Sequence, residues 1–406
     1  MNVDRMRKID YYAGVPLTFL ATLWVRLVGL FRSRRSSEVK NVLLIELSEM
    51  GSAILVDPAM QKLKREVDAN LHFCIFASNK PSLDLLGTVP QENIFTIREK
   101  SIATLALDSL QFLFWTRRRR IDTVMDLELF SRYTALLTGL SGARKRVGYY
   151  GFHNEGLYRG EMLTHRVAYN AHQHMARNFV ALVNAALAQT PELPYSKTLI
   201  GDEEIRLRKL SFTAEEQEHM RGLVRADYPE FDPAVQRIVL INPNASELLP
   251  QRRWMPERYT ELAQRLIDRF PDIVVLLTGS PSEREEAEGL RQRIDRDRCV
   301  NFAGRLKLSQ LPVLYSISAL MVTNDSGPGH FSSITDLRTF VLFGPETPAL
   351  YASLGNSTPI YAGLACSPCV SAANHRKTAC SDNVCLQAIT VDRVFGEVES
   401  SLSASS

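Results

Sequence analysis

The sequence predicts an α/β protein built of two doubly wound halves. Apolar runs typical of buried parallel strands alternate with longer mixed segments, and this alternation starts twice, at about residue 40 and at about residue 235. The chain has 406 residues, of which 45% are hydrophobic and 23% charged, as in an ordinary globular protein with room for two cores. We therefore expect one unit over about residues 40–185 and another over about residues 235–390.

The expected strands are short and apolar, and helical segments separate them. Pro256 suits the first turn of a helix over residues 256–269, and a second helix is expected over residues 282–294. The strands are expected at residues 41–47, 71–76, 94–97 and 123–127 in the first half, and at residues 237–242, 273–278, 320–323 and 339–343 in the second. Ligands of such sheets bind beyond the carboxyl ends of the strands, so the loops there are the candidates for chemistry.

The charge of the chain is nearly balanced, with 48 basic and 45 acidic residues and a net charge of +3. This balance argues against nucleic acid as the main partner. The basic excess lies in residues 1–40, which hold eight Lys or Arg and three Asp or Glu, a net +5.

Residues 11–31 (YYAGVPLTFLATLWVRLVGLF) form an apolar arm that could span a bilayer by length. Pro16 and Arg26 interrupt it, whereas aromatic residues near both ends and basic clusters on both sides favour a helix in the interface of an anionic membrane. A helix packed on the protein's own surface and a single-pass span are the alternatives. A cleaved signal peptide fits poorly because no small-x-small site follows the apolar run.

The loop at residues 323–330 (TNDSGPGH) follows an apolar strand and precedes a helical segment. Its small residues would let a phosphate approach backbone N–H groups at the helix start. Ser326 could donate to a phosphate oxygen, and Asp325 could accept sugar hydroxyls. A tight turn with a helix cap is the alternative.

Three further loops follow strands of the same half. In residues 242–246 (NPNAS), Ser246 could bind phosphate, and Arg252 could neutralise a leaving diphosphate. Glu283 could accept hydrogen bonds from a ribose, or it could only offset a helix dipole. The loop at residues 343–348 (FGPETP) is uninformative alone.

Together these loops resemble glycosyltransferase family nine, the heptosyltransferases, which have the GT-B fold of two Rossmann-like domains facing a central cleft. The family's C-terminal half shows a small-residue loop, a basic residue two before Trp, a Gly-rich strand end, a run like N-D-S-G-P-x-H, and F-G-P-T. This sequence matches at residues 244–246, Arg252 and Trp254, Gly279, residues 324–330 and residues 343–345. Residues 44–53, 126–128 and 141–148 match the N-terminal half, so the resemblance covers about residues 40–390.

The resemblance implies a nucleotide-sugar site lined by Ser246, Arg252, Asp325, Ser326 and Gly327, to which we add Glu283 and His330. One position departs from the family. The glycine of its first loop is followed by an aspartate proposed as general base, but here Gly51 is followed by Ser52. A serine cannot deprotonate an acceptor unaided, so we expect Glu49 to substitute, and Glu46 less so because it falls within the expected strand.

Four cysteines cluster near the C-terminus, at Cys366, Cys369, Cys380 and Cys385. Their C-x2-C-x10-C-x4-C spacing is near zinc-ligand patterns without matching one, and disulfides or reduced thiols are the alternatives. We interpret the cluster as structural and expect no catalytic metal.

The resemblance implies an inverting, metal-independent glycosyltransferase that moves a heptose-like sugar from a nucleotide-diphosphate donor, such as ADP-heptose, to a lipid-linked saccharide such as lipopolysaccharide core. The alternatives are a non-catalytic nucleotide-sugar or glycolipid binding protein and another GT-B activity, such as a nucleotide-sugar epimerase. We expect it at the cytoplasmic face of a bacterial membrane. The expected parts are a membrane-associated helix (1–39), an acceptor domain (40–200), a connection (201–235) and a nucleotide-sugar domain (236–395).

Overall fold

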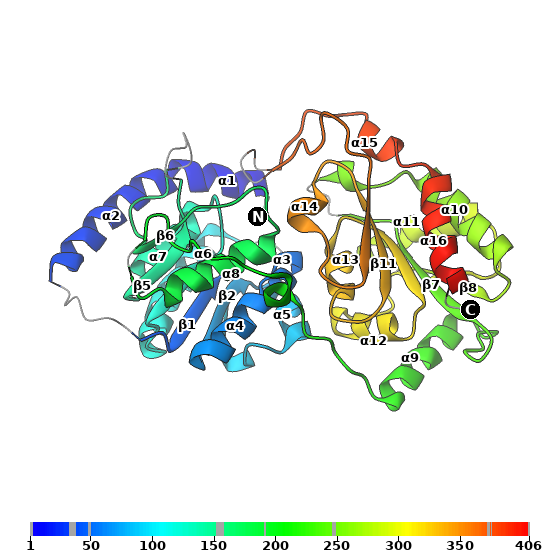
Figure 1. Ribbon diagram of the computed structural model, residues 1–406, viewed down its shortest axis with the longest axis horizontal. Helices are drawn as coiled ribbons and strands as arrows, with labels where there is room; N and C mark the ends of the chain where they lie inside the picture. The colour runs from blue at the N-terminus through cyan, green and yellow to red at the C-terminus, as the bar shows by residue number, and fades with distance from the viewer. Residues whose placement is uncertain are drawn as a thin grey trace. The chain divides into compact units, whose positions relative to one another are not determined.

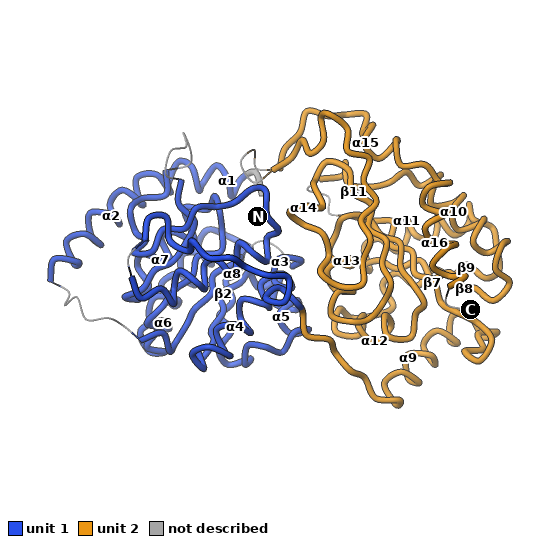
Figure 2. Tube along the Cα trace, viewed as in Figure 1, with its two compact units in different colours: residues 1–206 blue, residues 207–406 orange. Residues whose placement is uncertain are grey.

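The computed structural model describes residues 3–31, 38–47, 50–151, 158–190, 192–245, 249–371, 374 and 376–404. The chain divides into two compact units, Met1–Arg206 and Leu207–Ser406 (Figure 2). Each unit is a six-stranded parallel sheet flanked by helices (Figure 1). The two doubly wound halves predicted from the sequence are therefore confirmed.

The sheet of unit 1 has the strand order β3-β2-β1-β4-β5-β6. Its strands are β1 (Asn41–Ile45), β2 (Asn70–Phe76), β3 (Ile94–Ile97), β4 (Thr123–Asp126), β5 (Lys145–Tyr149) and β6 (His165–Val167). Its helices are α1 (Val3–Tyr12), α2 (Gly14–Leu30), α3 (Met50–Leu55), α4 (Asp57–Val67), α5 (Lys80–Leu86), α6 (Ile102–Arg118), α7 (Arg132–Leu140) and α8 (Met175–Leu187).

The sheet of unit 2 has the order β12-β11-β10-β7-β8-β9, which is the same order when the strands of each unit are numbered from one. Its strands are β7 (Arg237–Asn242), β8 (Ile273–Leu277), β9 (Cys299–Asn301), β10 (Leu320–Asn324), β11 (Arg338–Phe343) and β12 (Ser357–Tyr361). Its helices are α9 (Ala214–Asp227), α10 (Pro256–Arg269), α11 (Arg284–Ile294), α12 (Leu311–Ser316), α13 (Gly327–Ser332), α14 (Pro348–Tyr351), α15 (Val384–Gln387) and α16 (Val391–Ala404).

Each sheet has one point where the strand order reverses, between β1 and β4 in unit 1 and between β7 and β10 in unit 2. Loops that leave these neighbouring strands diverge to opposite faces and open a crevice at the carboxyl edge. In unit 2 the loops after β7 and β10 hold the predicted residues Arg252 and Asp325. The topology therefore brings two segments about seventy residues apart to one place.

Burial of strands and helix faces holds unit 2 together. β8 is buried along its whole length, as an interior parallel strand requires. Against the sheet packs α10, whose buried side chains recur with the helical period at Tyr259, Leu262, Ala263, Leu266 and Ile267. Each buried Leu or Ile side chain contributes roughly 1.5–3 kcal/mol relative to an exposed one.

Sequence reasoning found the central strands and missed four others. The missed strands are β5, β6, β9 and β12, which include both edges of unit 2 and one edge of unit 1. Edge strands pair with only one neighbour and are often short or polar, so they leave no long apolar run in the sequence. The strand expected over residues 41–47 ends at Ile45, so Glu46 lies just past the strand and not within it. The reason given for preferring Glu49 over Glu46 is therefore wrong.

The N-terminal helices pack on α7. Along one stripe of α2, Gly14, Thr18, Ala21 and Thr22 are buried, and a Cβ on Gly14 would lie 2.9 Å from the Arg132 side chain. Small residues let the two helices approach closely. The rest of α2 exposes large apolar side chains, namely Leu17, Phe19, Leu20, Leu23, Trp24, Leu27 and Leu30.

Polar contacts reinforce this packing. Asp10 of α1 accepts the backbone N–H of Tyr133 at 2.9 Å and lies 3.2 Å from Nη1 of Arg132, and Thr22 Oγ1 accepts the N–H of Glu161 at 2.9 Å. Among the described residues no single helix is long and apolar enough to cross a bilayer. Residues Arg5–Tyr12 and α2 meet that criterion only together, with a 43° bend between them.

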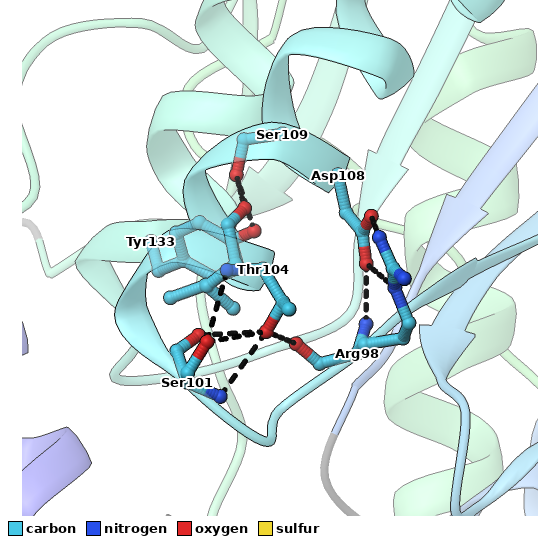
Figure 3. Close-up of polar contacts among 7 residues, drawn as sticks. Arg98, Ser101, Thr104, Asp108, Ser109 and Tyr133 are labelled. Carbon is cyan, nitrogen blue, oxygen red and sulfur yellow. Dashed lines mark hydrogen bonds and ion pairs between the residues drawn. The ribbon is translucent and has the colours of Figure 1, made fainter.

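Helix α6 is fixed at its start by a capping box and an ion pair (Figure 3). Ser101 Oγ accepts the N–H of Thr104 at 3.1 Å, and Thr104 Oγ1 accepts the N–H of Ser101 at 3.1 Å. The Arg98 guanidinium donates to Asp108 at 2.6 and 3.0 Å and holds the pKa of that carboxyl below its usual value. Ser109 and Tyr133 join α6 to α7 through a 2.6 Å hydrogen bond.

His72 of β2 should make unit 1 acid-sensitive. Its side chain is 0% exposed, and burial lowers its pKa to about 4. An unfolded chain binds a proton at this residue below about pH 6.5, so the free energy of unfolding falls as the pH drops from about 6.5 towards 4. His72→Phe should weaken that pH dependence in urea titrations at pH 7 and pH 5. The control His172→Phe, at an exposed histidine, should keep the pH dependence of the unmodified chain. If His72→Phe kept it as well, this expectation would be contradicted.

Candidate functional site

Asn324, the last residue of β10, joins the loops at the switch point of unit 2. Its Oδ1 accepts the N–H of Trp254 at 3.0 Å and the hydroxyl of Tyr259 at 3.0 Å, and its Nδ2 donates to the carbonyl of Pro243 at 2.6 Å. The residue is fully buried. A single amide therefore fixes the loop after β7 against the end of β10.

The next residue, Asp325, lies beside Arg252. Its Oδ2 is 3.7 Å from Nη1 of Arg252, and the side chains are 5% and 15% exposed. The backbone N–H of Asp325 donates to the carbonyl of Leu342 in β11 at 3.0 Å, which holds the loop in register. Arg252 ends the 3-10 turn Pro250–Arg252, two residues before the anchored Trp254. The predicted convergence of residue 252 with the loop at residues 324–330 is therefore present.

Arg252 retains donor capacity in this site. Among the residues that the structure describes, its buried Nε has no hydrogen-bond partner, and the 3.7 Å contact to Asp325 is longer than a normal hydrogen bond. A buried N–H donor without a partner costs free energy, and an anion bound at this point would remove that cost. This arrangement suits a diphosphate, whose oxygens can accept two N–H groups at once.

Ser326 and Gly327 start α13, where we predicted phosphate contacts. The Ser326 hydroxyl donates to the carbonyl of Asn324 at 3.1 Å and does not cap its own helix. A Cβ on Gly329 would come within 3.1 Å of Ser353 Oγ, so the short helix lies close to the segment before β12. His330, also predicted, is nearly buried within α13.

Glu283 lies in the loop after β8. Its Oε2 accepts the N–H of Ser280 at 2.6 Å, which is the helix-start role weighed as the alternative to a ribose contact. Asn242 ties this loop to β7, because its Nδ2 donates to Thr278 O and Oγ1 at 3.1 and 3.2 Å. The hydrogen bond that Glu283 accepts therefore lies within its own loop.

Two predicted residues, Glu49 and Ser246, lie outside the described residues. At the switch point of unit 1, the described carboxylates are Glu46, Asp126 and Glu128. Glu128 accepts the N–H of Leu47 at 3.0 Å and so holds the chain just past β1. Burial raises the pKa of Asp126, and the adjacent Arg159 guanidinium opposes that shift.

Asn244 was not singled out by sequence reasoning. It is 3% exposed, and within the described ranges neither its Oδ1 nor its Nδ2 has a hydrogen-bond partner. Buried amides are usually paired, so an unpaired one beside Arg252's loop indicates a position that a ligand completes. Its place in the loop after β7 could have suggested this role.

Asn324 should be essential for the stability of unit 2. Asn324→Ala leaves the Trp254 N–H, the Tyr259 hydroxyl and the Pro243 carbonyl without this partner, and we expect a loss of roughly 3 kcal/mol in the free energy of unfolding. Urea unfolding measures it. Asn356→Ala, at an exposed asparagine, should stay within about 0.5 kcal/mol, and a similar small loss at Asn324 would refute its anchoring role.

The four clustered cysteines are unpaired thiols in the structure. Cys385 is buried, Cys366 exposed, and Cys369 and Cys380 intermediate. No group of three or more His, Cys, Asp or Glu side chains is arranged to hold a metal among the residues described, which exclude His375.

A match to a family model covers residues 116–379, nearly two thirds of the chain, and the family is described as glycosyltransferase family 9 (heptosyltransferase). The matched segment includes every described residue that we assigned to the site of unit 2.

Curated relatives share identity over shorter stretches. The lipooligosaccharide heptosyltransferase 2 of Haemophilus influenzae is 31% identical over 118 residues, covering 28% of this chain and 34% of the relative. The lipopolysaccharide heptosyltransferase 2 of Salmonella typhimurium is 32% identical over 106 residues, covering 25% of this chain and 30% of the relative. The matches thus span about a third of these relatives' length.

Solved structures match over nearly the whole chain. The Escherichia coli ADP-heptose lps heptosyltransferase II superposes with a TM-score of 0.66 at 21% identity, covering 90% of this chain and 99% of that one. The E. coli heptosyltransferase WaaC with ADP gives 0.61 at 15% identity, covering 89% and 99%. At these identities the likeness shows the fold, which confirms the predicted GT-B class.

Proposed function

The chain belongs to glycosyltransferase family 9 (heptosyltransferase), and from this premise we propose that it transfers a heptose-like sugar from a nucleotide-diphosphate donor to a lipid-linked saccharide such as lipopolysaccharide core. The observation that carries the proposal is the largely buried side chain of Arg252 beside Asp325 at the switch point of unit 2, where its Nε has no hydrogen-bond partner among the described residues. The structural relatives support ADP-heptose as the donor, since one is an ADP-heptose lps heptosyltransferase and another is a heptosyltransferase with ADP.

The proposed reaction is a single displacement with inversion. An acceptor hydroxyl attacks the anomeric carbon, the bond from that carbon to the diphosphate oxygen breaks, and the nucleoside diphosphate leaves with the electron pair. Arg252 would neutralise charge that develops on the diphosphate, which is a larger effect in the transition state than in the bound donor. Asp325 would orient the guanidinium and accept sugar hydroxyls.

The proton of the acceptor hydroxyl needs a base, and we assign this role to Glu49. Ser52, which occupies the position after Gly51, is buried in α3 and carries no ionisable group suited to the task. The nucleotide would be held by Ser246, Ser326 and the loop around Gly327, with Glu283 and His330 as further contacts, and Asn244 joins this set.

The N-terminal arm would keep the enzyme at the cytoplasmic face of the membrane that carries its acceptor. Support comes from α2, which packs on α7 by small residues and turns a row of large apolar side chains to solvent. An exposed row of large apolar side chains is a surface that contact with a membrane would cover.

The serine at position 52 also favours a second candidate, a non-catalytic protein that binds a nucleotide sugar or a glycolipid. The transferase and a nucleotide-sugar binder both require the donor site of unit 2, whereas a glycolipid binder does not. The first two differ in whether bound donor is consumed.

The discriminating experiment incubates the full chain with ADP-heptose and a lipid-linked acceptor purified from heptose-deficient cells. Mass spectrometry of the acceptor should show the addition of one heptose, and ADP should be released in equal amount. Donor binding without either product would support the non-catalytic candidate, and absence of donor binding would refute both the transfer from ADP-heptose and the binding of this nucleotide sugar.

A further inference from the structure

Unit 1 contains a cavity of about 1060 Å³ that lies apart from the carboxyl edge of the sheet. It is lined at the opposite, amino edge by Lys40 before β1, Lys145 of β5 and the end of α7 at Gly139 and Leu140. Its size is at the upper end of the range for small-molecule sites. The proposed transfer reaction uses none of the residues that line it.

One wall of the cavity is apolar and comes from the last turns of α2. The stripe that packs α2 on α7 continues along the helix to Val25, Val28 and Gly29, all of which line the cavity together with Trp24. Helix α7 ends at Leu140, which also lines the cavity. The earlier turns of α2 therefore pack on α7, whereas its last turns face the cavity. Trp24 is 58% exposed, an unusual position for a large aromatic side chain unless an amphiphile or interface covers it.

The remaining wall is basic. Arg117, Arg144 and Lys145 line the cavity, and none of them pairs with a carboxylate in the described part of the chain. Arg117 donates to the carbonyls of Leu113, Leu140 and Ser141, and Lys145 donates to the carbonyl of Ala186 at 2.7 Å. These carbonyl oxygens carry no net charge, and the Asp122 carboxylate is the acidic group that acts on Lys145.

The acidic groups nearby do not balance this charge. Glu38 lines the cavity and is bound to Lys40 at 2.6 Å, and Asp122 accepts the backbone N–H groups of Lys40 and Asn41. Burial, reinforced by Lys145 and Arg146, lowers the pKa of His165 to about 4, so this imidazole adds no charge at neutral pH. A net positive potential therefore acts on whatever occupies the cavity.

We propose that this cavity binds the phosphate headgroup of an anionic membrane lipid, with Arg144 and Lys145 facing the phosphate and the final turns of α2, including Trp24, covering the start of an acyl chain. A basic wall selects an anion, and an apolar helix on the other side selects an amphiphile over a free anion. The site would hold α2 at a defined depth in the interface. The inference rests on the proposed membrane contact of the arm and is independent of the transfer reaction.

The test uses the full chain and a short-chain lipid, dihexanoylphosphatidylglycerol, below its critical micelle concentration. Binding should shift the Trp24 emission to the blue, and the shift should be absent in Trp24→Phe. The same titration with dihexanoylphosphatidylcholine should give an affinity at least about tenfold weaker, because that headgroup carries no net charge.

Charge variants locate the site. Arg144→Gln/Lys145→Gln should bind the anionic lipid about tenfold more weakly than the unmodified chain. The matched control Arg293→Gln/Lys307→Gln removes one Arg and one Lys from the surface of unit 2 and should stay within about twofold. If both double variants lost the same amount of affinity for the anionic lipid, the lipid would be attracted by the overall charge of the chain, and the proposal would be overturned.

Two further measurements identify the source of the anion. Inorganic phosphate at the lipid's concentration should not displace it, and displacement would overturn the lipid assignment in favour of a free anion. Co-sedimentation with phosphatidylglycerol vesicles tests the membrane contact alone. If the chain bound vesicles but not the soluble lipid, the membrane contact would be supported and the headgroup site would be refuted.

Discussion

Arg252→Gln is expected to lower kcat/KM for sugar transfer about 100- to 1,000-fold, the usual loss when one preorganised donor to developing charge is removed. The cause is the position of its guanidinium, which lies 3.7 Å from Asp325 and has a buried Nε without a partner among the described atoms. Steady-state kinetics with ADP-heptose and lipid-linked acceptor measure the effect. Most of the loss should be in kcat, because the diphosphate gains charge as the sugar leaves.

Two control variants separate this role from a general effect of charge. Arg252→Lys keeps the charge but loses the planar fork, and it should recover only part of the activity. Arg293→Gln removes a positive charge from the exposed side of α11 and should leave kinetics unchanged. If Arg252→Gln retained kcat/KM within about threefold, Arg252 would have no part in stabilising the leaving group.

Glu49→Gln is expected to lower kcat about 100- to 10,000-fold, the range that a general base contributes. The variant keeps the size and much of the hydrogen bonding of the side chain while removing its basicity. The rising limb of the pH–rate profile of kcat should disappear with it, which a merely structural residue would not cause.

Comparison with two neighbouring carboxylates makes the assignment specific. Glu46, just past β1, and Glu128, which accepts the Leu47 N–H, are two of the described carboxylates at this switch point. Glu46→Gln and Glu128→Gln should keep the pH limb even if Glu128→Gln loses activity by loosening the loop. If Glu49→Gln kept the pH limb and Glu46→Gln lost it, the base would be Glu46.

The sequence predicted the central strands and the convergence of two loops because buried parallel strands leave apolar runs and because topology forces neighbouring loops together. β7 and α10 were predicted with their observed bounds. The convergence of Arg252 with Asp325 followed from family resemblance and strand order, and the structure supplies the contact itself.

What the sequence could not supply depends on long-range pairing. In the sequence, Asn324 was only one residue of the motif at residues 324–330. Its anchoring role arises because β10 pairs with β7, which places the Asn324 amide against Trp254 and Pro243. Asn244 reads as a turn residue until its burial is known. The cavity under α2 arises where α7 ends, which no local pattern encodes.

Isothermal titration calorimetry with ADP and AMP is the most direct measurement of diphosphate recognition in unit 2. The account predicts that ADP binds the unmodified chain at least about tenfold more tightly than AMP, since a second phosphate adds charge-assisted hydrogen bonds, and that Arg252→Gln abolishes this difference. Equal affinities for ADP and AMP in the unmodified chain, or an undiminished difference in Arg252→Gln, would contradict it.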